Sequence, residues 1–153
     1  MTSKQMTLIA VAGSAGLLLG AFGFQLLGYA PCKLCIWQRW PHGAAVALGL
    51  IILWRPLIWM NLLGAVAAAT SGGLGIYHTG VEQGWWEGPN TCTSSNDLAV
   101  STEELMSQIM SAPLVRCDEI AWELLWLSMA SWNALISFGF AAVWLWAWRT
   151  GRA

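Results

Sequence analysis

The sequence predicts an all-α membrane protein: a four-transmembrane-helix bundle with one long loop that contains a short interfacial helix. Three observations predict this fold class. Hydrophobic residues make up 57% of the 153 residues and charged residues only 10%, against about 25% charged residues in an ordinary soluble domain. The chain has twelve tryptophans, a residue enriched at membrane–water interfaces. Four apolar segments approach the length of about 20 residues that a membrane-crossing helix needs.

These four segments form a single membrane domain over residues 1–153. The expected spans are residues 7–28, 36–54, 57–79 and 124–148. The first is longer than the apolar core of a cleaved signal peptide, which is about 7–15 residues, so we expect it to remain as a span. The turn at Arg55 and Pro56 is short, which makes the second and third spans antiparallel neighbours.

Small residues recur in two of the spans. The third span is rich in Ala, Gly, Ser and Thr between Ala65 and Gly75, and such a helix packs closely against other helices. The first span has small residues three and four positions apart, which also predicts close helix packing. These are Gly13, Gly16, Gly20 and Gly23.

The loops that carry the cysteines are residues 29–41 and 80–120, and the second is the only long polar segment. Ser101 and Glu104 have the spacing of a capping box that opens a helix. We expect this helix over residues 101–111, either in the membrane interface or docked on a partner. Its apolar face consists of Leu105, Met106, Ile109 and Met110.

The positions of the basic residues predict the orientation, because cytoplasmic loops carry an excess of Lys and Arg. One side has Lys4, Arg55, Arg149 and Arg152, and the other has Lys33, Arg39 and Arg116. We therefore expect both termini in the cytoplasm and all four cysteines outside it. An inner aromatic belt would consist of Trp54, Trp59, Trp144, Trp146 and Trp148. The net charge of −1 gives no support for nucleic-acid binding.

The segment 31–42 holds Cys32, Cys35, Arg39 and His42. If it is helical, each residue turns by about 100°. With Cys35 at zero, Cys32 then lies near 60°, Arg39 near 40° and His42 near −20°, so the four share one face. Proline suits the first helical position, so Pro31 would place both cysteines in the first turn, where the helix dipole stabilises a thiolate. Pro41 can kink this helix at its far end.

All four cysteines fall on the oxidising side of the predicted topology, where disulfides persist. One interpretation is that the two cysteine pairs form inert structural disulfides that hold the loops. A second is a relay, in which Cys92 and Cys117 reach a soluble partner and Cys32 and Cys35 reach a molecule dissolved in the bilayer. Disulfides exchange by thiolate attack through mixed disulfides, so two such pairs can pass electrons inward.

Together these residues resemble the disulfide bond formation protein B (DsbB) family, the quinone-linked membrane thiol oxidases of bacteria. The resemblance covers nearly the whole chain: four spans, Pro31 before the Cys32–Cys35 motif, Arg39 four residues after it, and a second cysteine pair between the last two spans. The stretches 77–86 and 127–133 are also similar to recurrent family stretches. The implied location is the bacterial inner membrane, with the cysteine loops in the periplasm.

The resemblance also implies roles. Cys92 would be attacked by a reduced DsbA-like soluble periplasmic oxidase, and Cys117 would resolve that species or cross to Cys32. Cys35 would then face a quinone, ubiquinone or menaquinone, drawn from the membrane pool. Arg39 would stabilise the thiolate and the developing quinone anion. His42 and His78 would be candidates to hydrogen-bond a quinone oxygen.

Three other interpretations are open. His42 and His78 on adjacent spans make a bis-histidine haem cytochrome conceivable, and a Soret band would reveal it. The four cysteines make a zinc site conceivable, although the second pair lacks short metal-ligand spacing; we expect no metal. Two structural disulfides would make the chain an inert membrane protein, and resistance of both to a reduced partner would reveal this.

Overall fold

The computed structural model describes residues 1–89, 92, 101–111 and 115–152. Within these residues the chain is mostly helical, as predicted, with one small hairpin in addition. The elements in chain order are α1 (Ser3–Leu26), α2 (Lys33–Trp54), α3 (Met60–Glu82), α4 (Thr102–Ser111), β1 (Glu123–Leu124), β2 (Leu127–Ser128) and α5 (Met129–Arg152).

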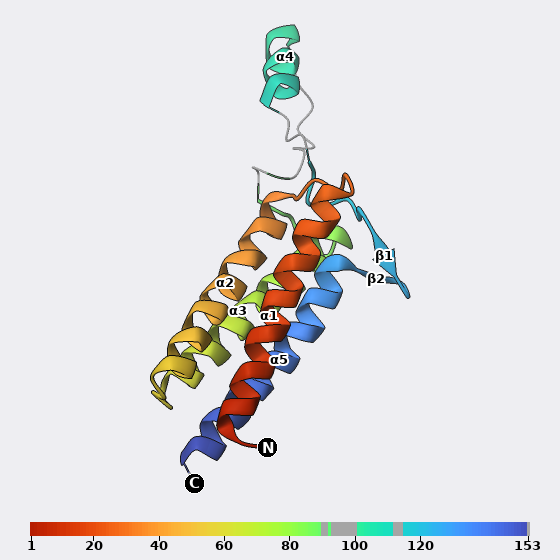
Figure 1. Cartoon of the computed structure of the whole chain (residues 1–153). Helices are drawn as coiled ribbons and strands as arrows, with labels where there is room; N and C mark the ends of the chain where they lie inside the picture. The colour runs from red at the N-terminus through yellow and green to blue at the C-terminus, as the bar shows by residue number, and fades with distance from the viewer. Residues whose placement is uncertain (90–91, 93–100, 112–114, 153) are drawn as a thin grey trace.

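The four long helices pack side by side in an antiparallel arrangement, with both chain ends at the same end of the bundle (Figure 1). Helix α1 packs against α2 and α5, and α3 packs against the same two helices. The Ser3 hydroxyl donates a hydrogen bond of 2.8 Å to the carbonyl oxygen of Ala147, which joins the first turn of α1 to the end of α5. The two cysteine-bearing connections therefore lie at the opposite end.

Helices α1 and α5 are long and apolar enough to cross a membrane, judged by length and composition. Their apolar windows face mostly outward, since only 22% and 28% of the residues are buried. Helices α2 and α3 have similar lengths of 22 and 23 residues. That they also span a membrane stays a prediction.

The close packing predicted for α3 is confirmed. Its buried positions include Gly64, Ala68, Gly72 and Gly75, and α3 makes its most extensive contact with α5. The ring of Trp144 lies over Gly64, where a Cβ atom would come within 2.6 Å of it. The assignment of Trp144 to an aromatic belt is wrong, because this side chain is fully buried in the core. A glycine on the facing helix makes room for it.

The last helix begins at Met129, later than the span predicted from residue 124. The preceding residues instead form an antiparallel hairpin, in which Glu123 pairs with Ser128 and Leu124 with Leu127. Ser128 then caps the helix, because its hydroxyl accepts a hydrogen bond of 3.2 Å from the Ser131 backbone N–H. Such a cap satisfies a donor that the first turn of a helix leaves free.

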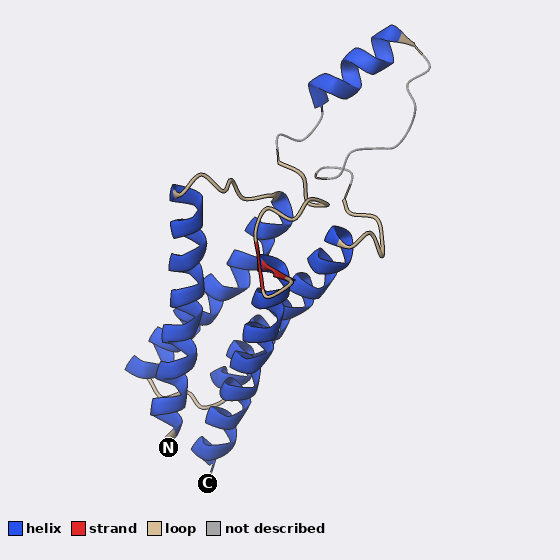
Figure 2. Cartoon of the chain, turned by 90° about the vertical axis from the view of Figure 1, so that its right-hand side faces the viewer, coloured by secondary structure: helices blue, strands red, loops and turns tan. Residues whose placement is uncertain are grey.

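Helix α4 covers Thr102–Ser111, within the range 101–111 for which a helix is expected, and it lies beyond the cysteine-bearing end of the bundle (Figure 2). That it belongs to a periplasmic loop stays a prediction. Met106 and Met110 are exposed on it. The side chains of Glu104, Leu105 and Ile109, which complete the predicted capping box and apolar face, lie outside the described residues.

Candidate functional site

The four cysteines lie together at one end of the bundle. Cys92 and Cys117 form a disulfide with their Cα atoms 5.3 Å apart, while Cys32 and Cys35 are free thiols with their sulfurs 2.8 Å apart. Cys32, Cys92 and Cys117 are buried in one apolar cluster, and Cys35 packs against it. The two pairs are therefore neighbours, and a zinc site built from all four thiolates is incompatible with this disulfide.

Cys32 begins the second helix. It is the N-cap of α2, and its sulfur accepts a hydrogen bond of 3.2 Å from the Cys35 backbone N–H. Pro31 precedes the cap, so the prediction that it occupies the first helical position is wrong by two residues. Both thiols still lie at the positive end of the helix dipole, which stabilises an anion. The helix continues through Pro41 to Trp54.

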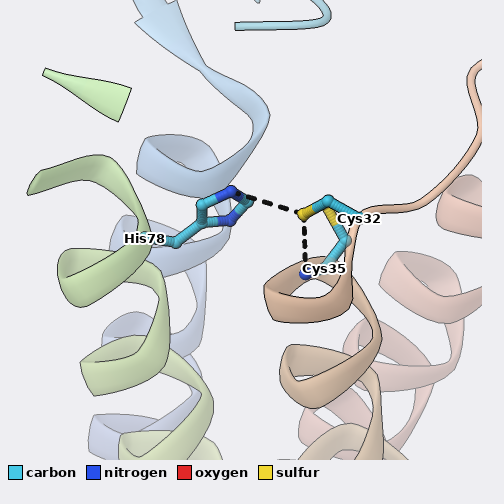
Figure 3. Close-up of side chains that lie close together, drawn as sticks. All are labelled: Cys32, Cys35 and His78. Carbon is cyan, nitrogen blue, oxygen red and sulfur yellow. Dashed lines mark hydrogen bonds between the residues drawn. The ribbon is translucent and has the colours of Figure 1, made fainter. Parts of the chain in front are cut away.

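His78 faces the cysteine pair from α3 (Figure 3). Its Nε2 atom lies 3.5 Å from the Cys32 sulfur and 3.8 Å from Oε1 of Glu82. Its Nδ1 atom lies 2.8 Å from Nε2 of Gln38. Because an amide nitrogen can only donate, Nδ1 accepts and the neutral ring carries its proton on Nε2. His78 therefore offers a hydrogen-bond donor to the Cys32 sulfur.

Gln38 connects His78 to a second buried histidine. Its Oε1 atom accepts a hydrogen bond of 2.7 Å from Nδ2 of Asn133, which fixes the orientation of both amides. Oδ1 of Asn133 then accepts from Nε2 of His42 at 3.0 Å. The Nδ1 atom of His42 is buried and has no partner within the described part of the chain. Buried polar groups are normally hydrogen-bonded, so this free acceptor suits the donor group of a ligand.

A cavity of about 260 Å³ lies beside this network. Six residues with polar side chains line it from α2, α3 and α5, and α1 supplies much of its apolar wall. The six are Cys35, Gln38, Arg39, His42, His78 and Asn133. An apolar pocket with a few convergent polar groups is the usual form of a small-molecule site.

The glycines of α1 help to form this cavity. The prediction that Gly16, Gly20 and Gly23 mark close helix packing is wrong, because a Cβ atom on any of them would meet no atom within 4 Å. Gly16 and Gly20 instead line the cavity. Only Gly13 of the four matches the prediction, since it contacts the ring of Phe140. The missing side chains leave space that a larger residue would fill.

Arg39 also lines the cavity, and its side chain extends toward α1. Its Nη1 atom donates a hydrogen bond of 3.0 Å to Oε1 of Gln25, and its guanidinium lies 5.1 Å from the centre of the Phe22 ring. The described residues place no carboxylate in an ion pair with it. Its positive charge is therefore available to the cavity that Cys35 also faces.

A second, smaller cavity of about 40 Å³ lies on the loop side of the cysteines. Its walls include Cys32, Cys35, Glu82 and Arg116. The Glu82 side chain is 5% exposed, and its Oε2 atom has no partner in the described residues. Beside Cys117, the Arg116 guanidinium binds Asp118 at 2.6 Å and holds the pKa of that carboxyl below its usual range.

The structure places the seven sequence-predicted residues in two adjoining groups. Cys32, Cys92 and Cys117 lie in one buried cluster, and the larger cavity is lined by Cys35, Arg39, His42 and His78. Cys32, Cys35 and His78 also place their ligand atoms within 4.8 Å of one another, so the reduced pair has the donor set of a soft metal ion. The sequence analysis missed Gln38, Asn133 and Glu82. These three residues could have been recognised from the sequence, because a polar residue within an apolar helix is usually functional.

These features define a class: a helical membrane protein with a disulfide and a dithiol in one buried cluster beside an apolar cavity. The family model "Disulfide bond formation protein DsbB" matches residues 3–147, and the chain belongs to this family. It is a disulfide bond formation protein in the sense of that family, with the thiol oxidoreductase character that membership indicates.

Curated relatives agree with this assignment. The chain is 33% identical over 144 residues to a disulfide bond formation protein B of Dechloromonas aromatica (strain RCB), covering 85% of this chain and 82% of that protein. It is 29% identical to another of Verminephrobacter eiseniae (strain EF01-2), covering 86% and 77%.

An uncharacterised protein of Rickettsia prowazekii (strain Madrid E) is 26% identical over 113 residues, covering 71% of this chain and 66% of its own length. No solved structure matches the chain.

Proposed function

We propose that this chain is a membrane thiol:quinone oxidoreductase that reoxidises a DsbA-like periplasmic oxidase and so supports protein disulfide formation. One observation carries the proposal. Cys35 lines both cavities, whereas Cys32 lines only the smaller one, on the side of the loop that holds Cys117. The dithiol therefore has one sulfur toward the loop disulfide and one toward a pocket for a small molecule.

The overall reaction balances at this dithiol. Two thiols plus one quinone give one disulfide plus one quinol, with two electrons and two protons transferred. A bound quinone supplies the electron acceptor and is exchanged with the membrane pool as quinol. The cavity fits such a ligand, because its walls are largely apolar and its polar groups converge beside Cys35.

Each polar residue has a distinct part in this site. Arg39 stabilises negative charge, both on the Cys35 thiolate and on a ligand oxygen. His78 donates from Nε2, because Gln38 holds its Nδ1 atom as the acceptor. His42 presents a buried acceptor at Nδ1, which matches the hydroxyl of a quinol. Glu82 lies next to His78 and provides a carboxylate that can accept a thiol proton.

The loop disulfide connects this site to the soluble partner. The reduced partner attacks Cys92 to form a mixed disulfide, which releases the Cys117 thiol. The second thiol of the partner then displaces Cys92, so that the partner leaves as a disulfide and the loop pair is left as two thiols. Cys117 attacks Cys32 of a Cys32–Cys35 disulfide formed beforehand at the expense of quinone, which releases Cys35, and Cys92 then closes the loop disulfide again and releases Cys32. The clustering of Cys32 with the Cys92–Cys117 disulfide supports this exchange. A DsbA-type partner has a potential near −120 mV, so oxidising it with an ordinary disulfide is uphill by about 1.4 kcal/mol per 30 mV. Electron transfer to quinone draws the exchange forward.

The proposed topology has four spans, α1, α2, α3 and α5, with both termini in the cytoplasm of a bacterium. Exposed apolar side chains support it, because they occur on all four helices, for example Leu19, Leu50, Val66 and Leu135. Large exposed apolar surfaces of this kind mark contact with protein or membrane. The basic residues Lys4, Arg55, Arg149 and Arg152 share the end of the bundle opposite the cysteines.

The test is single-turnover quinone reduction by the fully reduced purified protein without oxygen, with free thiols counted in parallel. We expect two thiols to be lost per quinone reduced, and no reduction by Cys35→Ala. The matched control replaces Cys92 and Cys117 together by Ala. This variant should still reduce quinone once but should not turn over with a reduced DsbA-like partner.

Quinone reduction that survives in Cys35→Ala would contradict the assignment of this thiol. If the wild-type protein reduces no quinone and both disulfides resist the reduced partner, the proposal fails. A disulfide-stapled structural protein would then be the better account. A Soret band would favour haem, although ligation by Nε2 of His78 would move the ring proton to Nδ1 and so break the hydrogen bond from Gln38.

A further inference from the structure

The hairpin before α5 has an unusual tip. Leu125 and Trp126 connect its two strands with φ angles of 52° and 61°. Two consecutive residues with positive φ make the tight turn that matches the twist of a hairpin, and Asn-Gly is the preferred sequence for it. A leucine and a tryptophan are unfavourable there, since side chains with a Cβ atom rarely adopt this conformation. Strained backbone of this kind often accompanies function.

The same residues display apolar side chains. Trp126 is 90% exposed, Leu125 67% and Leu124 50%. No charged residue lies at the tip, and the only one in the hairpin is Glu123, at the base of the first strand. The hairpin therefore combines a costly backbone conformation with costly exposed surface. Both costs have a common explanation if the tip is not in water.

The hairpin is held against the start of α5. Trp132, in the first turn of that helix, donates a hydrogen bond of 3.1 Å from its ring nitrogen to the Leu124 carbonyl oxygen. Helix α5 is a candidate membrane span that begins directly after the second strand. The hairpin projects sideways at the level of the first turns of α5, not beyond the bundle end where α4 lies (Figures 1 and 2).

We infer that Leu124, Leu125 and Trp126 insert into the headgroup–acyl boundary of the lipid bilayer and anchor the Cys117 loop to the membrane. Tryptophan favours this interface, and leucine favours the acyl region below it. The tip is continuous with a helix whose apolar side chains Leu135 and Phe138 are also exposed. This inference requires only that α5 spans the membrane, and it does not depend on quinone or on a redox partner.

The test uses the full chain in lipid nanodiscs, labelled with 5-fluorotryptophan and observed by ¹⁹F NMR. The Trp126 resonance is the one missing in Trp126→Phe, and Trp144 serves as the fully buried reference. We expect lipid carrying a nitroxide near its headgroup to broaden the Trp126 signal several-fold more than that of Trp144. An aqueous gadolinium chelate should leave the Trp126 signal sharp.

Broadening by gadolinium alone would place the tip in water and overturn the inference. Protection from both agents would also overturn it, because a second copy of the chain or another protein would then cover the tip.

A paired substitution gives a second readout. Leu125→Asn with Trp126→Gly supplies the preferred turn residues but removes the apolar tip. If the hairpin were only a connector, relieving its strain would slow amide hydrogen exchange in residues 117–128. Anchoring predicts the opposite, exchange on the order of tenfold faster in nanodiscs, because local opening becomes easier. Slower or unchanged exchange contradicts the inference.

Discussion

At the scale of single residues, the site depends on two amides that fix two imidazoles. Gln38 and Asn133 each donate and accept with different partners, so neither amide can rotate without losing hydrogen bonds. The orientation of Gln38 makes His78 a donor at Nε2, and that of Asn133 makes His42 an acceptor at Nδ1. His78 therefore donates toward the Cys32 sulfur, whereas His42 keeps a free acceptor for a ligand.

Replacing Gln38 by Leu tests this arrangement. The change leaves His78 Nδ1 and Asn133 Nδ2 without their partner, and an unsatisfied buried polar group costs about 1–3 kcal/mol. We expect the free energy of unfolding in detergent to fall by that amount. Gln83→Leu is the control, since this glutamine is exposed at the end of α3 and its replacement should change stability by less than about 0.5 kcal/mol. Equal effects of the two would refute the structural role of the network.

Gly20 tests the cavity without touching a polar residue. A Cβ atom at this position would meet no atom within 4 Å. Because Gly20 lines the cavity, a leucine side chain there would extend into the cavity. We expect Gly20→Leu to raise the KM for quinone about tenfold, a loss of about 1.4 kcal/mol of binding, in steady-state quinone reduction. Gly139→Leu, on the exposed surface of α5 away from the cavity, should leave KM unchanged. An unaltered KM in Gly20→Leu would mean that quinone binds elsewhere.

At the scale of helices, the contact between α3 and α5 determines how close His78 and Asn133 come. This contact relies on Gly75, where a Cβ atom would lie 2.9 Å from the Ala130 carbonyl oxygen and 3.0 Å from the Ala134 backbone nitrogen. Those atoms belong to the backbone of α5 and cannot rotate away. The small-residue stretch of α3 therefore positions the site as well as stabilising the bundle.

Two alanine substitutions on the same helix separate packing from helix propensity. Gly75→Ala should destabilise the protein by about 1–3 kcal/mol, the usual cost of overpacking. Gly73→Ala meets no atom within 4 Å and should stabilise it by about 0.5–1 kcal/mol, because alanine loses less entropy in a helix. Thermal unfolding of both variants in the same detergent measures the difference. If both substitutions lower the free energy of unfolding, overpacking against α5 does not explain the effect of Gly75→Ala.

At the scale of the whole molecule, the antiparallel bundle places four of its seven Lys and Arg side chains at the end opposite its cysteines. Lys4, Arg55, Arg149 and Arg152 occupy one end, and the two cysteine pairs occupy the other. Under the proposed topology, the cysteine end would face the compartment in which disulfides persist.

Reporter fusions test this orientation. Alkaline phosphatase folds only outside the cytoplasm, so we expect activity when it is fused after residue 89 and none when it is fused after residue 56 or 152. Fluorescent-protein fusions at the same positions should give the reverse pattern, which controls for expression. Phosphatase activity at residue 152 would require an odd number of spans and would contradict the proposed topology.

Much of this protein follows from local pattern. Hydropathy and small-residue spacing predict the long helices, and the cysteine motif with Arg39 predicts the reactive end, because these properties depend on neighbours along one helix. The boundary of α5 was mispredicted because hydropathy does not distinguish an apolar hairpin from the apolar start of a helix. Residues 123–128 are apolar enough for either, and backbone pairing decides between them.

Contacts between helices decide the remainder. The glycines of α1 have the same spacing whether they pack or leave space, and only the partners opposite them determine which occurs. Gln38 and Asn133 lie on different helices, so no pattern within one segment reveals that they bond to each other. The same holds for Glu82, which lies near the cysteines only because α3 packs beside α2. The residues alone therefore identify the family and its reactive thiols. Tertiary packing creates the cavity, the histidine hydrogen bonds and the exposed tip of the hairpin, because each of these depends on atoms distant in the chain.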